Sequence, residues 1–221
     1  MTTVGFIGSG LIGGTVARLA VTAGYDVVLS NSRGPETLAG LVQDLGDKAR
    51  AATPADAAGA DLVVVSVPFH AHSALPVEQL AGKVVLDTNN YYPARDGNFA
   101  ELDEGRLTSA ELEQRHLAGA KLVKVFNNIF HLHLASLARP HGAADRSALT
   151  IAGDDAAAKQ AVTEFLDAIG YDTVDVGPLA ESWRVEPGQP VYGTPFGSFE
   201  DPAGTPASVA KVGAAVAEAK R

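Results

Sequence analysis

The feature that most constrains this fold is a regular alternation of short strand-like runs with helix-like stretches. The runs are rich in β-branched residues, and several are apolar on both alternating faces, which is typical of central parallel strands covered by helices on both sides. The sequence therefore predicts an α/β fold with a doubly wound, mostly parallel, Rossmann-like sheet. The predicted strands are Val4–Ile7, Asp26–Ser30, Leu62–Val67, Val84–Asp87, Leu122–Phe126, Leu149–Ala152 and Thr173–Val176.

Helix start and stop signals separate these runs. The stretch Leu11–Ala23 is followed by a glycine, which favours a helix end there. Thr53 precedes a proline, as an N-cap precedes a first helical residue. Thr108-Ser109-Ala110-Glu111 has the spacing of a capping box. Asp155–Ile169 reads as a further helix that ends at a glycine.

Two segments break the alternation. Tyr91–Gly105 is rich in Pro, Gly, Asn and Asp and reads as a loop, and Gly177–Thr205 holds most of the Pro and Gly of the C-terminal third. A small-residue helix is expected over Pro206–Lys220. We expect a dinucleotide-binding domain over residues 1–177 and a C-terminal extension over 178–221 that completes a ligand cleft and ends in this helix.

Composition excludes several classes of function. The 17 Lys and Arg against 26 Asp and Glu give a formal net charge of −9, the opposite of what a nucleic-acid backbone requires. Cysteine is absent, so disulfides, thiolate catalysis and Cys-ligated metals are excluded. The N-terminal residues have no basic region typical of a signal peptide, and no apolar run approaches the ~18 residues of a membrane span. We expect a cytoplasmic protein that binds neither nucleic acid nor membrane.

The motif with the clearest chemistry is Gly8-Ser9-Gly10-Leu11-Ile12-Gly13, a G-x-G-x-x-G between the first strand and the first helix. Gly8 permits a tight turn, Gly10 lets the backbone approach a pyrophosphate, and Gly13 lets the helix pack near the strand. Unpaired N–H groups at the helix start then attract the anion. This context predicts a dinucleotide site rather than a merely structural turn.

The second strand ends in Ser30-Asn31-Ser32-Arg33, where an NAD-preferring site usually has an acidic residue. Hydroxyls, an amide and an arginine suit a 2′-phosphate, with Arg33 donating charge-assisted hydrogen bonds. We therefore expect NADP(H) as the cofactor. The alternative is a solvated loop arginine among ordinary turn residues.

Further candidates follow other strands, because ligands of such sheets lie beyond the carboxyl ends of the strands. Val67, Pro68 and Phe69 are expected beside the nicotinamide, and the amides of Asn89 and Asn127 are expected to reach the cofactor. Asn128, Ile129 and Trp183, the single tryptophan, are expected to contact a second ligand. Each amide has the alternative role of a local cap.

The six histidines include the pairs His70 and His72, and His131 and His133, which lie two positions apart. Residues two positions apart point to different sides of a helix, so neither pair would bind one metal from a helix. The histidines are also not accompanied by a carboxylate triad or an H-E-x-x-H motif. A Gly-x-Ser-x-Gly nucleophile motif is also absent. We expect no metal site and no side chain acting as catalytic acid, base or nucleophile.

Several motifs together carry a resemblance. GFIGSGLIG, SNSR, VSVPF, KVFNNI, ALTIAGDD and GPLAESWRVEP, in this order between Thr3 and about Tyr192, resemble the NADP oxidoreductase family typified by coenzyme F-420-dependent NADP reductase. The resemblance implies a homodimer that exchanges hydride between NADPH and a deazaflavin. It assigns Ser9, Gly10, Leu11 and Ile12 to the pyrophosphate, Ser32 and Arg33 to the 2′-phosphate, and Val67, Pro68 and Phe69 to the nicotinamide side.

Two positions depart from the family pattern. Asn127 stands where deazaflavin reductases have a histidine, and Trp183 stands where they tend to have an arginine. The resemblance therefore supports the dinucleotide site more strongly than it supports the identity of the acceptor. The acceptor could be a deazaflavin, a flavin or another small-molecule redox acceptor. An imine or pyrroline reductase is the second possibility, although only 44 residues follow Gly177, too few for a long helical dimerisation domain. An NADPH-binding sensor without turnover is the third.

Overall fold

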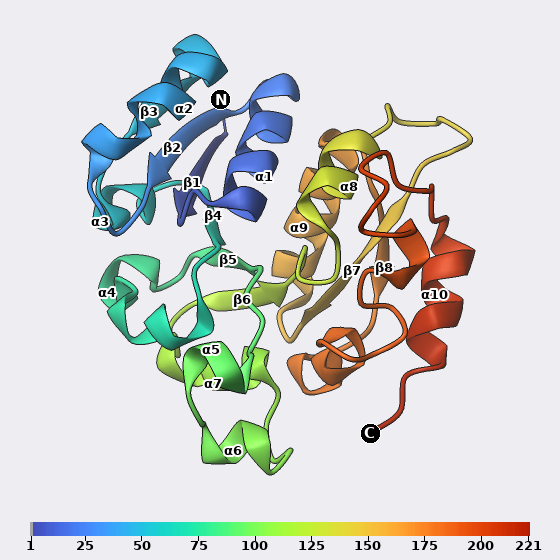
Figure 1. The fold of residues 1–221 in the computed structure, drawn as a ribbon. Helices are drawn as coiled ribbons and strands as arrows, with labels where there is room; N and C mark the ends of the chain where they lie inside the picture. The colour runs from blue at the N-terminus through green and yellow to red at the C-terminus, as the bar shows by residue number, and fades with distance from the viewer. Residues whose placement is uncertain (1) are drawn as a thin grey trace.

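The computed structural model describes residues 2–221 and places eight strands in one sheet, in the order β3-β2-β1-β4-β5-β6-β7-β8 (Figure 1). Neighbouring strands are parallel except β6 and β7, which are antiparallel. This order confirms the predicted doubly wound, mostly parallel α/β fold. The strands are β1 (Thr3–Ile7), β2 (Asp26–Ser30), β3 (Ala49–Ala51), β4 (Leu62–Val65), β5 (Val84–Asp87), β6 (Lys121–Lys124), β7 (Ala148–Gly153) and β8 (Asp172–Asp175).

The central strands are buried on both faces because their alternate side chains enter two separate cores. Val64 packs into one core and its neighbours Val63 and Val65 into the other. Helices α1, α8 and α9 contribute buried side chains to the first core, and α3, α4 and α7 to the second. The α-helices are α1 (Leu11–Thr22), α2 (Ala39–Leu45), α3 (Pro54–Ala57), α4 (Val77–Leu80), α5 (Pro93–Asp96), α6 (Ala100–Asp103), α7 (Ser109–His116), α8 (His131–Ser136), α9 (Ala156–Ala168) and α10 (Val209–Ala217).

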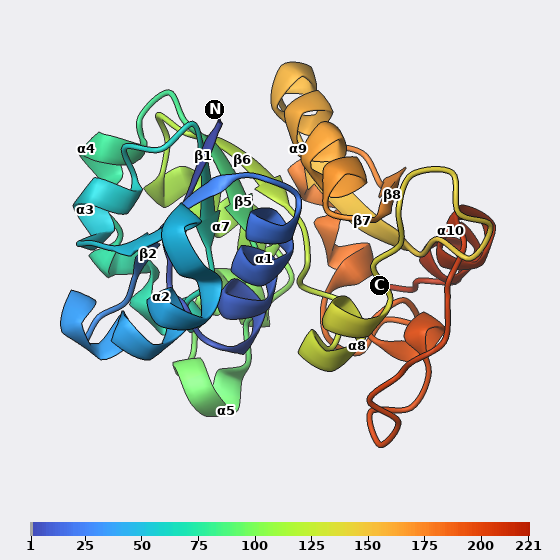
Figure 2. The ribbon, with the colours of Figure 1, turned by 90° about the horizontal axis from the view of Figure 1, so that it is seen from above.

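The C-terminal residues lie against the last two strands. Helices α9 and α10 lie on opposite sides of β7 and β8, as Figure 2 shows from above. Between β8 and α10 the chain forms two 3-10 helices, η4 (Leu179–Val185) and η5 (Thr194–Phe196). Further 3-10 turns are η1 (Pro35–Leu38), η2 (Gly46–Lys48) and η3 (Phe69–Ala74). None of the helices in residues 2–221 has the length and apolar character needed to cross a bilayer.

Several predicted boundaries differ from the structure. β4 ends at Val65, two residues early, because the Val67 N–H leaves the sheet and donates to Asn89 Oδ1 at 3.0 Å. β6 spans Lys121–Lys124 rather than Leu122–Phe126, because Phe126 has a φ of 62° that a strand cannot contain. β3 was not predicted, since its three residues form no apolar run. The last helix is shorter than Pro206–Lys220 because the Ser208 hydroxyl caps its start.

The loop predicted over Tyr91–Gly105 contains two single-turn helices, α5 and α6. The N-cap predicted at Thr53 and the capping box predicted at Thr108 are both present, and Thr53 also forms a capping box. Thr53 accepts from Asp56 N and Thr108 from Glu111 N, and each acidic side chain accepts in return from the N-cap backbone. These local signals were readable in the sequence because capping involves residues only three positions apart.

Candidate active site

A cavity of about 740 Å³ lies at the carboxyl ends of β1, β4, β5 and β6 and continues to the C-terminal extension. This is where a doubly wound sheet binds ligands. Nine of the residues predicted from the sequence line it: Gly10, Leu11, Ile12, Val67, Pro68, Asn89, Asn127, Asn128 and Ile129. Residues Tyr192, Gly193 and Phe199 of the extension form part of its wall.

The glycine turn has the geometry that an anion site requires. Gly8 has a φ of 98°, and a Cβ at Gly13 would lie 2.2 Å from the Gly8 carbonyl oxygen, so helix and strand approach closely. A Cβ at Gly10, in contrast, would meet no atom within 4 Å. The first turn of α1 contains no acidic residue and no side-chain cap. Its N–H groups and the space above Gly10 are therefore available to a phosphate.

The end of β2 divides into buried and exposed residues. Ser30 is wholly buried and its hydroxyl donates to the Phe6 carbonyl at 2.7 Å, so the expectation that Ser30 contacts a cofactor phosphate is wrong. The Ser9 hydroxyl donates to the Ser30 carbonyl at 3.0 Å. A phosphate at this turn would therefore be bound by the backbone of Ser9 rather than by its hydroxyl. Asn31 orders the turn, because its Oδ1 accepts from Arg33 N at 2.9 Å. Ser32 and Arg33 are exposed, and Arg33 has no ion-pair partner within residues 2–221.

Asn127 lines the cavity and carries a buried acceptor atom without a partner in residues 2–221. Its Nδ2 donates to the Val185 carbonyl at 2.8 Å and to Asn90 Oδ1 at 3.1 Å, while its Oδ1 is buried without a hydrogen-bond partner in the described chain. The residue is 5% exposed. Phe126, which precedes it, is the one non-glycine residue with positive φ among residues 2–221. Such strained backbone is typical of functional sites, and here it turns Asn127 out of β6 toward the cavity.

Asn128 uses its side chain within the protein. Its Nδ2 donates to the Val191 carbonyl at 3.3 Å, its Oδ1 accepts from Thr150 at 3.3 Å, and its carbonyl accepts from Gly193 N at 2.9 Å. Asn128 therefore holds the extension against the end of β6. Because it also lines the cavity, the contact of its amide with a second ligand stays a prediction. Ile129, 6% exposed, supplies an apolar part of the cavity wall.

Two predicted aromatic contacts are absent from the cavity lining. Phe69 is wholly buried and packs against Tyr91, Phe99 and His72, with ring centroids 5.1–5.7 Å apart. It therefore supports the Val67-Pro68 segment from behind instead of facing the ligand.

Trp183 lies in η4 with the guanidinium groups of Arg184 and Arg221 over its ring, at 4.4 and 5.3 Å. It does not line the cavity. The structure therefore gives no support to the prediction that this ring stacks on an acceptor, since η4 packs along α7 and Trp183 is absent from the cavity lining.

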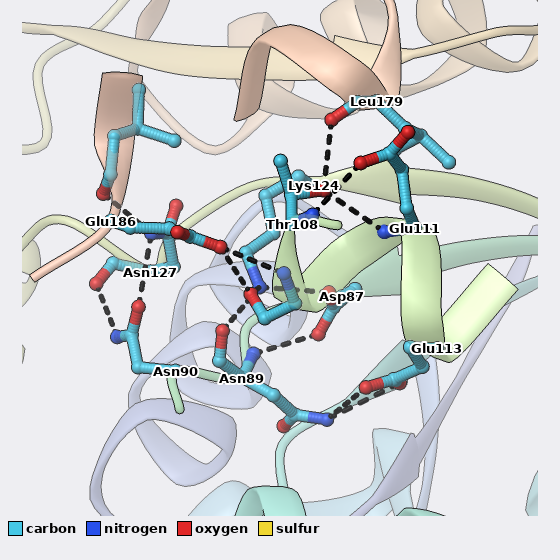
Figure 3. A network of polar contacts seen from close by, with 12 residues as sticks. Asp87, Asn89, Asn90, Thr108, Glu111, Glu113, Lys124, Asn127, Leu179 and Glu186 are labelled. Carbon is cyan, nitrogen blue, oxygen red and sulfur yellow. Dashed lines mark hydrogen bonds and ion pairs between the residues drawn. The ribbon is translucent and has the colours of Figure 1, made fainter. Parts of the chain in front are cut away.

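A network of charges that we did not predict lies directly beneath Asn89 (Figure 3). Lys124 Nζ lies 2.9 Å from Asp87 Oδ2 and also donates to the Asn89 carbonyl, and both charged side chains are fully buried. Asn89 Nδ2 donates to the two carboxylate oxygens of Glu113 at 3.2 and 2.9 Å. Because Asn89 Oδ1 accepts from Val67 N, the network holds two cavity-lining segments together.

Burial, with the Asp87 carboxylate nearby, raises the pKa of Glu113 to about 8, against the opposing effect of Lys124. One positive charge cannot neutralise two ionised carboxylates in a buried site. Glu113 therefore holds a proton at neutral pH. A sequence signal for this network existed, since Lys124 interrupts an apolar strand and Asp87 ends one.

A second charged group orders the loop after β5. Asp96, buried, accepts from Arg95 Nε and Nη2 at 2.9 and 2.8 Å, from Tyr92 N at 2.9 Å and from His70 Nδ1 at 2.9 Å. Burial by itself would raise the pKa of Asp96, but these hydrogen bonds outweigh it and hold the pKa well below its ordinary value. The loop from Asn90 to Asp96 is thereby fixed against the 3-10 turn η3.

Cavity residues absent from our predictions come mainly from this loop and from the extension. They include Asn90, Tyr92, Arg95, Phe130, His131, Tyr192 and Phe199. The loops were recognisable from their Pro and Gly content, but no local pattern showed which of their side chains face inward.

Comparison with known proteins gives the following relatives. The model of the protein family described as NADP oxidoreductase, coenzyme F420-dependent, matches residues 3–91. A curated relative, the metalloreductase STEAP3 of Rattus norvegicus, is 32% identical over 186 residues, which are 83% of this chain and 35% of that protein. A second, the protein YjhV of Escherichia coli, is 42% identical over 53 residues, 24% of this chain and 39% of that protein. The chain thus spans little more than a third of these curated relatives.

Solved structures extend the similarity over the whole fold. A hypothetical protein from Sinorhizobium meliloti is 31% identical, with a TM-score of 0.75, over 86% of this chain and 93% of that one. A protein from Arthrobacter sp. FB24 assigned as an F420-dependent NADP reductase is 27% identical, with a TM-score of 0.66, over 82% and 87% of the two chains. A pyrroline-5-carboxylate reductase from Coxiella burnetii, 16% identical with a TM-score of 0.61, over 87% of this chain and 64% of that one, shares the fold.

Proposed function

Because the chain belongs to the NADP oxidoreductase, coenzyme F420-dependent, family, we propose that it transfers a hydride between NADP(H) and a planar redox acceptor, a deazaflavin of the coenzyme F-420 type or a flavin. The observation that carries the proposal is the continuity of one cavity. It joins the open glycine turn to the apolar residues Val67, Pro68 and Ile129 and to the wall formed by the C-terminal extension.

The donors and acceptors of this cavity fit a nicotinamide dinucleotide. The N–H groups at the start of α1 suit its pyrophosphate, and exposed Ser32 and Arg33 suit a 2′-phosphate. Asn127 lines the cavity, and we expect the carboxamide of nicotinamide beside it. NADPH, when bound, would supply the hydride.

We expect the protein to contribute to hydride transfer mostly by positioning the two rings. We expect the cavity-lining residues Val67, Pro68 and Ile129 to exclude water and to hold two flat rings in contact. The Lys124 network fixes Asn89 and Val67, and Asn128 fixes the extension. Hydride transfer between stacked rings depends strongly on such fixed spacing.

The test is a two-part assay. Titration calorimetry measures NADPH and NADH binding, and absorbance follows NADPH oxidation with a deazaflavin, FMN, FAD, a small cyclic imine or ferric citrate. We expect NADPH binding and turnover with the deazaflavin or a flavin. Tight NADPH binding without turnover of any acceptor would instead indicate a sensor. Turnover of ferric citrate alone would place the activity with metal reduction, the activity named for the STEAP3 relative.

A further inference from the structure

Two tyrosines from distant parts of the chain meet at the wall of the cavity. Tyr92 precedes α5 and Tyr192 lies between η4 and η5, 100 positions later, yet their hydroxyl groups are hydrogen-bonded to each other. Both residues line the cavity, and both are only partly buried. The pair closes the cavity between the loop after β5 and the C-terminal extension.

The position of the pair is set by the end of β6. On one side Asn90 Nδ2 donates to the Asn127 carbonyl at 2.7 Å, and Asn127 Nδ2 donates back to Asn90 Oδ1. On the other side Asn128 bonds to the residues that flank Tyr192, accepting from Gly193 N and donating to the Val191 carbonyl. Both phenols are therefore held beside the turn that presents Asn127 to the cavity.

The hydrogen-bond count leaves one proton donor unused. Two phenols have two O–H donors, and the bond between them uses one. Neither hydroxyl has another hydrogen-bond partner in residues 2–221. The second O–H is therefore free at the cavity wall.

The surroundings of Tyr192 favour the neutral form of its phenol. Burial and then the bond to Tyr92 raise the pKa of Tyr192, and the Arg95 guanidinium opposes this. That guanidinium, bonded to Asp96, lies 4.8 Å from the centre of the Tyr92 ring and so holds this ring in place beside the cavity.

We propose that Tyr92 and Tyr192 form the proton-donating end of the cavity and select an acceptor that gains a proton together with the hydride. The proposal rests on the proposed function, which supplies the hydride. The acceptor class is a C=O or C=N compound, or a deazaflavin or flavin ring, which gains a hydride at one ring atom and a proton at a ring nitrogen. An acceptor that takes single electrons, such as a ferric complex, gains no proton and therefore does not need the tyrosine pair.

The step balances in atoms and electrons. In a C=O or C=N compound the carbon receives the hydride with its electron pair, and the π electrons move to X, the O or N atom. In a deazaflavin C5 receives the hydride and in a flavin N5 receives it. The conjugated π electrons then move to the ring nitrogen N1, which is X in these two acceptors. One phenol O–H bond breaks and an X–H bond forms. The other phenol then returns a proton to the phenolate, and solvent water reprotonates the pair.

The test compares Tyr92→Phe, Tyr192→Phe and the double variant with the wild type. Tyr25→Phe is the matched control, because Tyr25 packs edge-on against Phe165, away from the cavity. Phenylalanine keeps the ring, and neither hydroxyl supports another residue, so we expect all variants to fold by circular dichroism. The substrate arms are a 5-deazaflavin, FMN, a cyclic imine and ferric citrate.

We expect the double variant to lose about 100-fold or more in kcat with the deazaflavin, FMN or the imine, as for loss of a general acid. The NADPH Kd should stay within about twofold. A readout without turnover is calorimetric titration of FMN or deazaflavin into protein loaded with NADP⁺, where the double variant should bind about 2- to 10-fold more weakly. Tyr25→Phe should match the wild type in both.

The possible failures are distinguishable. If the wild type reduces an organic acceptor and the double variant does so at the same rate and affinity, this proposal alone is wrong. If the wild type binds NADPH but reduces no organic acceptor, both the proposed function and this proposal are wrong. If it reduces ferric citrate alone, and the double variant retains that rate, the pair has no part in the reaction.

Discussion

The ammonium group of Lys124 lies 2.9 Å from the Asp87 carboxylate, and neither side chain is exposed to solvent. The two residues end adjacent strands, β6 and β5, and are paired in the sheet register. The lysine also donates to the Asn89 carbonyl, so the ion pair is continuous with the wall of the cavity.

Replacing Lys124 with methionine should therefore destabilise the protein strongly. The substitution keeps much of the side-chain volume but leaves Asp87 as a buried charge without its partner, which costs about 3–5 kcal/mol. Urea unfolding measures the loss. The double variant Lys124→Met with Asp87→Asn should recover part of it, and a single-variant loss below about 1 kcal/mol would contradict the buried pairing.

Glu113 should make stability fall as pH rises. The folded protein holds the Glu113 proton up to about pH 8, whereas the unfolded chain releases it near the ordinary pKa of 4.5. Between these values the folded state binds more protons, so the free energy of unfolding decreases by up to about 1.4 kcal/mol per pH unit. Urea unfolding from about pH 5 to pH 8 should show this slope in the wild type and lose it in Glu113→Gln. An unchanged slope in Glu113→Gln would assign the dependence to other groups.

Two glycines of the same turn should respond differently to alanine. At Gly13 a Cβ would lie 2.2 Å from the Gly8 carbonyl oxygen, so backbone must move, at a cost of about 1–3 kcal/mol. At Gly10 the new methyl meets nothing within 4 Å and the φ of −78° suits alanine. Gly10→Ala should keep its Tm yet bind NADPH about tenfold or more weakly, because the methyl occupies the phosphate space. Equal NADPH affinity in Gly10→Ala and the wild type would remove the pyrophosphate from this turn.

Arg33 should decide between the two nicotinamide cofactors. It is exposed beside the end of β2 without an ion-pair partner in residues 2–221, and a 2′-phosphate would give it one. Arg33→Ala should weaken NADPH by roughly 1.5–3 kcal/mol, one to two decades in Kd, and leave NADH nearly unchanged. Arg106→Ala, which removes an equal charge from a surface pair with Glu104, is the control. A parallel loss for both cofactors in calorimetry would overturn the assignment.

The histidines near the cavity should matter for structure more than for chemistry. His131→Ala should keep kcat within about tenfold, below the effect of losing a general acid or base. His133, wholly buried, bonds through Nε2 to the Asp201 carbonyl at 2.8 Å, so its alanine variant should lower the Tm instead. A thousandfold fall in kcat for His131→Ala, with the fold intact, would make it an acid–base group.

Much of the dinucleotide end was predictable because its determinants are local. A strand, a G-x-G-x-x-G turn and a helix occupy consecutive residues, and the free space at Gly10 and the close contact at Gly13 follow from that order. The capping boxes at Thr53 and Thr108 and the two-faced apolar strands are local in the same sense. Ser30 is the exception at this end of the site. It is the last residue of β2, and its buried hydroxyl donates to the Phe6 carbonyl of the neighbouring strand β1.

By itself, then, the sequence determined the α/β class and the position and polarity of the anion-binding turn. Only the tertiary structure decided which side chains of the long loops face the cavity. It paired Tyr92 with Tyr192, buried Phe69 away from the cavity lining and placed Trp183 beside Arg184 and Arg221. The physical reason is that these contacts join segments up to 100 residues apart. They depend on where the antiparallel β6–β7 pairing and the hydrogen bonds of Asn127 and Asn128 place the extension.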